Sequence, residues 1–98
     1  MNRQDAITVL REHAEVLKAR GVRHAALFGS VARDEAGPLS DLDILIELAP
    51  DAELDAYAYA GLKRYIAGLF STRVDVVNRE ALKPYLRRPA ESDAIYAF

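Results

Sequence analysis

The sequence contains no cysteine, and this absence excludes disulfide bonds and thiolate metal ligands. It fits a reducing compartment, and we expect the protein to be cytoplasmic. Long apolar runs are also missing, since no window approaches the roughly 18 apolar residues that a membrane-spanning helix requires. The first residues lead into mixed-charge sequence without the apolar stretch of a secretory signal. The sequence therefore predicts no association with a membrane.

A surplus of positive charge is missing as well. Thirteen Lys and Arg residues face fifteen Asp and Glu residues, so the formal net charge is −2. Proteins dedicated to nucleic acids usually carry a basic surplus, because phosphate contacts dominate their affinity. We therefore expect no direct nucleic-acid binding. What is present, 51% apolar and 29% charged residues, is the composition of one ordinary globular domain spanning residues 1–98.

The spacing of apolar residues predicts helices that alternate with strands. Helices are expected over 4–20, 30–35, 53–70 and 79–87, the last one interrupted by Pro84, and strands over 22–28, 41–48 and 73–77. The apolar tail 94–98 is either a fourth short strand or a segment that docks onto a partner. This order predicts an α/β (α+β) fold in which helices pack on a sheet of three or four strands.

Three carboxylates stand on the expected strands where apolar side chains are usual. Asp41 and Asp43 are two residues apart, so both side chains point to one face, with Cα atoms about 6.6 Å apart. Asp75 interrupts the apolar run 74–77, and all three acids converge if the two strands are neighbours. Two divalent cations would offset the unfavourable burial of these carboxylates and create a phosphoryl- or nucleotidyl-transfer site. Magnesium is the expected ion, because the ligands are hard oxygens.

Simpler explanations exist for the same acids. Asp41 and Asp43 would also fit a solvated strand edge. Asp75 would also fit an ion pair with Arg73 or Arg79. These alternatives are less favoured once the segment upstream is considered.

That segment, Phe-Gly-Ser-Val-Ala-Arg over 28–33, joins the first expected strand to a helix. Gly29 lets the backbone approach a phosphate closely, and the start of a helix offers unpaired N–H groups to an anion. The Ser30 hydroxyl can add a hydrogen bond, and Arg33 supplies positive charge. Ser30 would equally serve as an ordinary N-cap, and Arg33 as the partner of a neighbouring acid.

Together the glycine–serine segment and the acidic motif point to one family. Gly-Ser-Val-Ala-Arg over 29–33, followed by Ser-Asp-Leu-Asp over 40–43, resembles the GSxAR…SDxD signature of the polymerase-beta-like nucleotidyltransferase superfamily. In length and motif order the whole chain is similar to the minimal nucleotidyltransferases of prokaryotes. The resemblance implies the polymerase-beta-like nucleotidyltransferase fold, with a small mixed sheet of three or four strands.

The resemblance also implies a role for each acidic residue. Asp41 and Asp43 would hold two Mg²⁺ ions, and Asp75 would complete this metal site and help to deprotonate the attacking hydroxyl. All three acids are intact in this sequence. An active enzyme is therefore expected, with in-line attack on the α-phosphate of ATP and release of pyrophosphate.

For the nucleotide, the resemblance implies that Gly29 and Ser30 hold the triphosphate of ATP. Arg33 and Ser40 fit supporting roles beside them. The expected binding residues thus flank the acidic motif on its N-terminal side.

Minimal nucleotidyltransferases of this kind are commonly the antitoxin of a pair whose toxin is a HEPN-domain ribonuclease. The resemblance implies that the antitoxin binds this toxin and transfers AMP from ATP to one of its tyrosines. Larger relatives carry an added domain that holds the acceptor, and 98 residues leave no room for one. We therefore expect a folded protein acceptor in a hetero-oligomer.

Two other functions stay open. The first is a binding-only antitoxin that masks the toxin without chemistry. The second is a nucleotidyltransferase for small molecules of the aminoglycoside type, which the missing acceptor domain argues against. Nucleic-acid polymerisation is the least favoured activity, because the charge balance is acidic.

Overall fold

A four-stranded mixed sheet forms the centre of the protein in the computed structural model, which describes residues 2–35, 37 and 40–98. Its strands are β1 (Val22–Phe28), β2 (Leu42–Leu48), β3 (Val74–Asn78) and β4 (Ile95–Tyr96), in the order β3-β2-β1-β4. Strand β1 pairs antiparallel with β2 and with β4, whereas β2 and β3 are parallel. The predicted fold class is confirmed, and the C-terminal tail provides the fourth strand.

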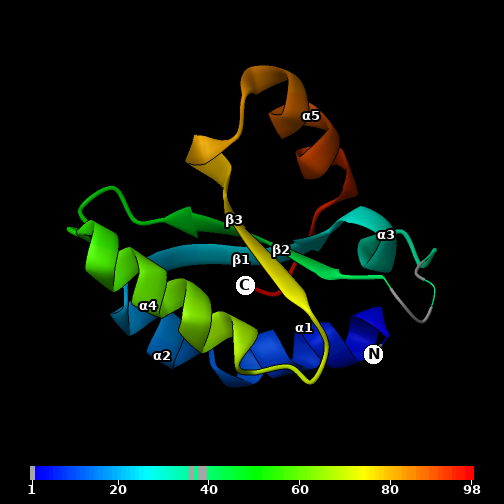
Figure 1. Cartoon of the computed structure of the whole chain (residues 1–98), viewed down its shortest axis with the longest axis horizontal. Helices are drawn as coiled ribbons and strands as arrows, with labels where there is room; N and C mark the ends of the chain where they lie inside the picture. Colours follow the sequence, from blue (N-terminus) through cyan, green and yellow to red (C-terminus); the bar gives the residue numbers. More distant parts are fainter. Residues whose placement is uncertain (1, 36, 38–39) are drawn as a thin grey trace.

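Helices cover the two faces of this sheet unequally (Figure 1). The helices on one face are α1 (Arg3–Glu12), α2 (Ala14–Ala19) and α4 (Ala56–Ala67), whereas α5 (Pro84–Asp93) lies on the other. The short α3 (Gly29–Ala32) follows β1, and a 3-10 turn, η1 (Arg79–Ala81), follows β3. Within residues 2–35, 37 and 40–98, no helix has the length and apolar character needed to span a lipid bilayer.

The main core lies between the sheet and the helices α1, α2 and α4. Leu42, Ile44 and Ile46 alternate along β2, and all three are buried. The covering helices contribute further buried apolar side chains: Ile7, Leu10, Leu17, Leu62 and Ile66. Because side chains on a strand alternate between its faces, Asp43 points to the opposite face, which carries α5.

The helix expected over 4–20 is in fact two helices. His13 separates them, and its backbone N–H donates to the Leu10 carbonyl at 3.2 Å, which tightens the last turn of α1. The His13 ring Nδ1 also lies 2.8 Å from the Val9 carbonyl. The apolar spacing continued across the break because both helices pack on the same face of the sheet.

The helix expected over 79–87 was placed wrongly. Pro84 is the first residue of α5 and does not interrupt a helix. Proline suits this position, because the first helical N–H has no intrahelical partner and the ring already sets a helical φ. The segment before it is η1, where the Asn78 side chain accepts a hydrogen bond from the Glu80 N–H at 3.1 Å.

The other two helices are shorter than expected. Helix α4 begins after Asp55, whose side chain accepts a hydrogen bond from the Ala58 N–H at 2.7 Å and so provides its N-cap. Helix α3 covers Gly29–Ala32 and ends before Asp34, which has a positive φ of 60°. A residue in this left-handed conformation cannot continue a right-handed helix.

Candidate active site

Parallel pairing of β2 with β3 brings two of the predicted site carboxylates side by side. Asp43 and Asp75 are direct register partners, so their Cα atoms are separated by one strand spacing, about 4.8 Å. Asp41 lies just before β2, two residues from Asp43, and its negative charge acts on the Asp43 carboxyl. The three acids are therefore neighbours where β2 begins.

The surroundings of Asp43 disfavour its charged form. Burial raises the pKa of the Asp43 carboxyl above its usual value, and the negative charges of Asp75 and Asp41 raise it further. The positive charge of Arg33 acts in the opposite direction. Asp43 is thus a half-buried acid that is harder to ionise than a free one, with three charged neighbours.

The donor set suits a hard divalent cation in its chemistry. Carboxylate oxygens are the ligands that Mg²⁺ prefers, and a cation would relieve the repulsion around Asp43. The three side chains do not converge on one point, however. The described part of the chain contains no group of three acidic or histidine residues placed to hold one ion. Asp41 instead lies 3.7 Å from the Arg73 guanidinium, in an exposed ion pair.

The ion pairs in the structure bear on the simpler explanation of Asp75. Arg73 pairs with Asp41, and Arg79 pairs with Glu80 and Glu91. Neither arginine is therefore placed as a partner of Asp75. The exposed Asp75 side chain lines a pocket instead.

Gly29 is required by its backbone and by its neighbour. Its φ of +76° lies in the left-handed region that side chains disfavour. A Cβ atom added here would overlap a carboxylate oxygen of Asp43 and lie 3.2 Å from its Cγ. The missing side chain therefore lets the turn between β1 and α3 lie directly against the Asp43 carboxylate.

Arg33 ends the same motif and connects it to α5. Its Nη1 donates to Asp93 Oδ2 at 2.6 Å, and its Nε donates to Glu35 Oε2 at 3.1 Å. These hydrogen bonds, the one to Glu35 first, raise the pKa of the guanidinium. Pairing with a neighbouring acid was the simpler explanation of Arg33, and Glu35 is that neighbour. The contact with Asp93, sixty residues away, was not predicted.

The two serines of the motif take different positions. Ser30 is the second residue of α3 and is half-buried, so it is not the N-cap, which is Phe28. Ser40 closes the approach to β2: its hydroxyl accepts a hydrogen bond from the Gly37 N–H at 3.0 Å. Its own N–H donates to the Gly37 carbonyl at 3.1 Å. In this structure Ser40 thus makes hydrogen bonds with the backbone of the segment before β2.

A pocket of about 350 Å³ lies beside these residues, between the sheet and α5. Its charged and polar lining comes from the predicted site and from the end of α5: Gly29, Arg33, Asp75 and Asp93. Its apolar lining is Phe28, Val77, Leu82, Leu86, Pro89 and Ala90. A volume of this order suits a small ligand, or part of one, with most of its surface against apolar groups.

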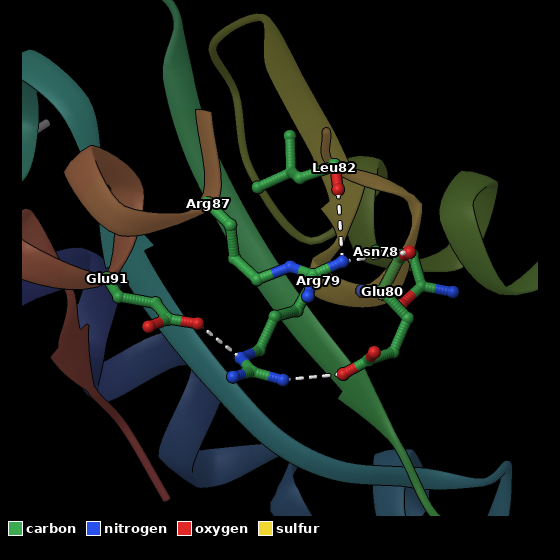
Figure 2. Close-up of polar contacts among 6 residues, drawn as sticks. All are labelled: Asn78, Arg79, Glu80, Leu82, Arg87 and Glu91. Carbon is green, nitrogen blue, oxygen red and sulfur yellow. Dashed lines mark hydrogen bonds and ion pairs between the residues drawn. The ribbon is translucent and has the colours of Figure 1, made fainter. Parts of the chain in front are cut away.

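Figure 2 shows how α5 is tied to the segment that follows β3. Arg79 Nε donates to Glu91 Oε1 at 2.6 Å, and Arg79 Nη1 donates to Glu80 Oε1 at 2.5 Å. Arg87 Nη2 donates to the carbonyl of Leu82 at 3.1 Å. These polar contacts join α5 to the segment after β3, and Ala90 is the residue of α5 that is buried.

The sequence did not predict that α5 forms one wall of the pocket. Pro84 could have indicated the start of this helix, since proline is frequent at the first position of a helix. A helix that begins there places Leu86 and Ala90 one turn apart on the same side. Nothing local to Asp93 indicated its contact with Arg33.

The fold and the site define a class of protein. Acidic residues on two adjacent parallel strands lie beside a glycine–serine turn and a pocket, in the arrangement that the motifs predicted for a nucleotidyltransferase. The chain belongs to the nucleotidyltransferase domain family, whose model matches residues 10–97. It is therefore a transferase, as its motifs predicted.

Two relatives carry a more specific activity in their names. MJ0128 of Methanocaldococcus jannaschii, which is assigned as a protein adenylyltransferase, is 38% identical over 90 residues, covering 90% of each chain. The protein adenylyltransferase MntA of Thermococcus cleftensis is 32% identical over 90 residues, covering 91% of this chain and 89% of MntA. The chain is thus similar to these enzymes over nearly its whole length.

A solved structure has the same fold. It contains the tri-AMPylated HEPN toxin of Shewanella oneidensis in complex with an MNT antitoxin. The match has a TM-score of 0.64 and 19% identity, and it covers 94% of this chain and 71% of that one. At this identity the likeness concerns the fold.

Proposed function

We propose that this protein is the antitoxin of a HEPN toxin–antitoxin pair and transfers AMP from ATP to a tyrosine of the toxin. The pairing of Asp43 with Asp75, directly against the Gly29 turn, is the observation that carries the proposal. The relatives named as protein adenylyltransferases support a protein acceptor. The fold that the chain shares with a complex containing an AMPylated HEPN toxin supports the choice of partner. ATP as donor supports a cytoplasmic location for the reaction.

The reaction forms one bond and breaks another. The tyrosine oxygen bonds to the α-phosphorus of ATP, the bond from this phosphorus to the bridging oxygen breaks, and pyrophosphate leaves. The exposed Asp75 carboxylate, on the lining of the pocket, accepts the phenolic proton. Asp41, Asp43 and Asp75 would hold two Mg²⁺ ions, which when bound neutralise charge on the phosphates.

The glycine–serine turn is the place for the triphosphate. Gly29 exposes backbone at the start of α3 next to Asp43, and Ser30 follows with a hydroxyl. Arg33 lines the same pocket and supplies positive charge. Ser40 contributes by holding the approach to Asp41 in shape. In this arrangement the chain acts mainly by positioning and by electrostatic stabilisation.

The test is intact-protein mass spectrometry of the candidate toxin. The HEPN-domain protein is incubated with this chain, Mg²⁺ and ATP, and its mass should rise in steps of one AMP. The same incubation with the variant Asp41→Ala/Asp43→Ala should leave the mass unchanged. If the wild type adds no AMP and Asp43→Ala still neutralises the toxin, binding without chemistry is the function.

Arg33 provides a prediction about the nucleotide. A hydrogen bond to a charged group contributes about 1.5–3 kcal/mol, so we expect Arg33→Gln to raise the KM for Mg-ATP about 10- to 100-fold. Steady-state kinetics should show a smaller change in kcat. Arg23→Gln, at an exposed position on β1, is the control and should leave KM unchanged. If Asp93→Asn raises KM by the full amount, Arg33 acts only by holding α5.

A further inference from the structure

The outer side of α5 exposes apolar side chains next to the pocket. Tyr85 is 69% exposed and Leu86 is 47% exposed, and they are consecutive residues. Among the residues that the structure describes, the other large exposed apolar side chains lie on separate elements: Val16 on α2, Tyr57 on α4 and Tyr96 on β4. Within the described part of the chain, α5 is thus the element on which two such side chains are adjacent.

This surface is continuous with the pocket that contains Asp75. A shallow hollow on the outer side of α5 is lined by Pro84, Tyr85, Arg88, Pro89 and Ser92. Pro89 also lines the pocket, and Leu86 lines the pocket while being partly exposed. A molecule that occupies the pocket beside Asp75 therefore lies next to this surface.

The charges on α5 are divided between its ends. The acids Glu91 and Asp93, in its C-terminal half, are bound to Arg79 and Arg33. Its N-terminal half carries exposed cations, with Lys83 just before the helix and Arg88 on the rim of the hollow. The charge available to a partner on this side is therefore positive.

We infer that the α5 surface, formed by Pro84, Tyr85, Leu86, Arg88 and Pro89, is where the acceptor protein docks. The inference rests on the proposed function, because a tyrosine of a folded protein must place its hydroxyl at Asp75. The acceptor is too large to enter the pocket and must rest on the rim, which is apolar along α5. The occupant is a protein segment with apolar and acidic side chains close to the acceptor tyrosine.

The matched variants are Tyr85→Ser and Tyr57→Ser. Both tyrosines are exposed, Tyr85 at 69% and Tyr57 at 83%, so both variants should melt like the wild type. A central aromatic contact of an interface is worth at least about 2 kcal/mol, so Tyr85→Ser should raise the KM for the toxin at least about 30-fold. The KM for ATP should stay unchanged, and Tyr57→Ser should change neither constant.

A charge reversal tests the second half of the inference. Arg88→Glu should weaken binding of the toxin, measured as a Kd in the absence of ATP, and Arg64→Glu on α4 should not. Toxin binding by Tyr85→Ser and Arg88→Glu at the wild-type Kd would overturn the inference. A dimer of the chain alone that Tyr85→Ser dissociates would also overturn it, because the surface would then be a contact between copies.

The two proposals fail in different ways. If the wild type binds the toxin through α5 but adds no AMP, the proposed function is wrong. The docking surface is then still supported by the Kd values of the variants. If the wild type adds AMP and both α5 variants keep the wild-type KM for the toxin, the docking surface is wrong and the proposed function stands.

Discussion

Asp43→Asn is expected to lower the rate of AMP transfer at least about 10³-fold, because it removes a charged group from the centre of the proposed metal site. The folded protein should be as stable as the wild type or more stable. Asp43 is half-buried beside Asp75 and Asp41, and the substitution removes a repelled charge while nearly preserving shape. The gain in the free energy of unfolding should lie between zero and about 1 kcal/mol.

The same substitution should change how stability depends on pH. The pKa of Asp43 in the folded protein is raised above its ordinary value of 3.8, chiefly by burial and then by its acidic neighbours. Between the two pKa values the folded state therefore binds more protons at this group than the unfolded state does. Its contribution to stability falls as the pH rises through this window, and the loss persists above it.

Thermal melting from about pH 3 to about pH 7 measures this effect. The Tm of Asp43→Asn minus the Tm of the wild type should grow through the window and then level off. Asp51→Asn, at an exposed position, is the control and should leave both the Tm and the transfer rate unchanged. If Asp43→Asn fails to fold, or transfers AMP at the wild-type rate, the assigned role of Asp43 is wrong.

Gly29→Ala should damage both stability and transfer. Alanine disfavours the φ of +76°, and its Cβ would overlap the Asp43 carboxylate. Strain of this kind costs about 1–3 kcal/mol, and each kcal/mol lowers the Tm of a domain of this size by about 4–8 °C. Transfer should fall by more than the loss of folded protein explains, because the displaced groups are Asp43 and the turn assigned to the triphosphate. Calorimetry and the mass assay measure the two effects.

Gly61→Ala is the matched control for this substitution. Gly61 lies inside α4, and a Cβ there would meet the Arg20 Nη2 atom at 3.5 Å, an ordinary contact. Alanine should stabilise the helix by about 0.5–1 kcal/mol and leave transfer unchanged. If Gly29→Ala behaves like Gly61→Ala, the turn does not lie against Asp43 as described.

A double variant separates the two causes of the strain at Gly29. Asp43→Ala removes the carboxylate that the new Cβ would meet, so Gly29→Ala should be less destabilising in that background. The part that remains is the strain of the backbone φ. Equal effects of Gly29→Ala in both backgrounds would assign the whole loss to the backbone.

The strands were predictable because their signal is local. Leu42, Ile44 and Ile46 repeat with a period of two, so their common face and the opposite face of Asp43 follow from the sequence. Helix ends were less predictable. At His13 and Pro84 the apolar spacing continues, but the backbone hydrogen bonding changes. The backbone hydrogen bonds decide where a helix begins and ends, and the apolar spacing does not show them.

By itself, the sequence determined which chemistry the protein carries and the face of β2 to which Asp43 points. The spacing over 29–33 and 40–43 marks the family, because each motif is a continuous segment whose geometry is local. Tertiary structure decided the rest of the site. The alignment of Asp43 with Asp75 and the contact between Arg33 and Asp93 join segments far apart in the chain. Such contacts depend on which apolar faces are buried together, and a local pattern does not contain that information.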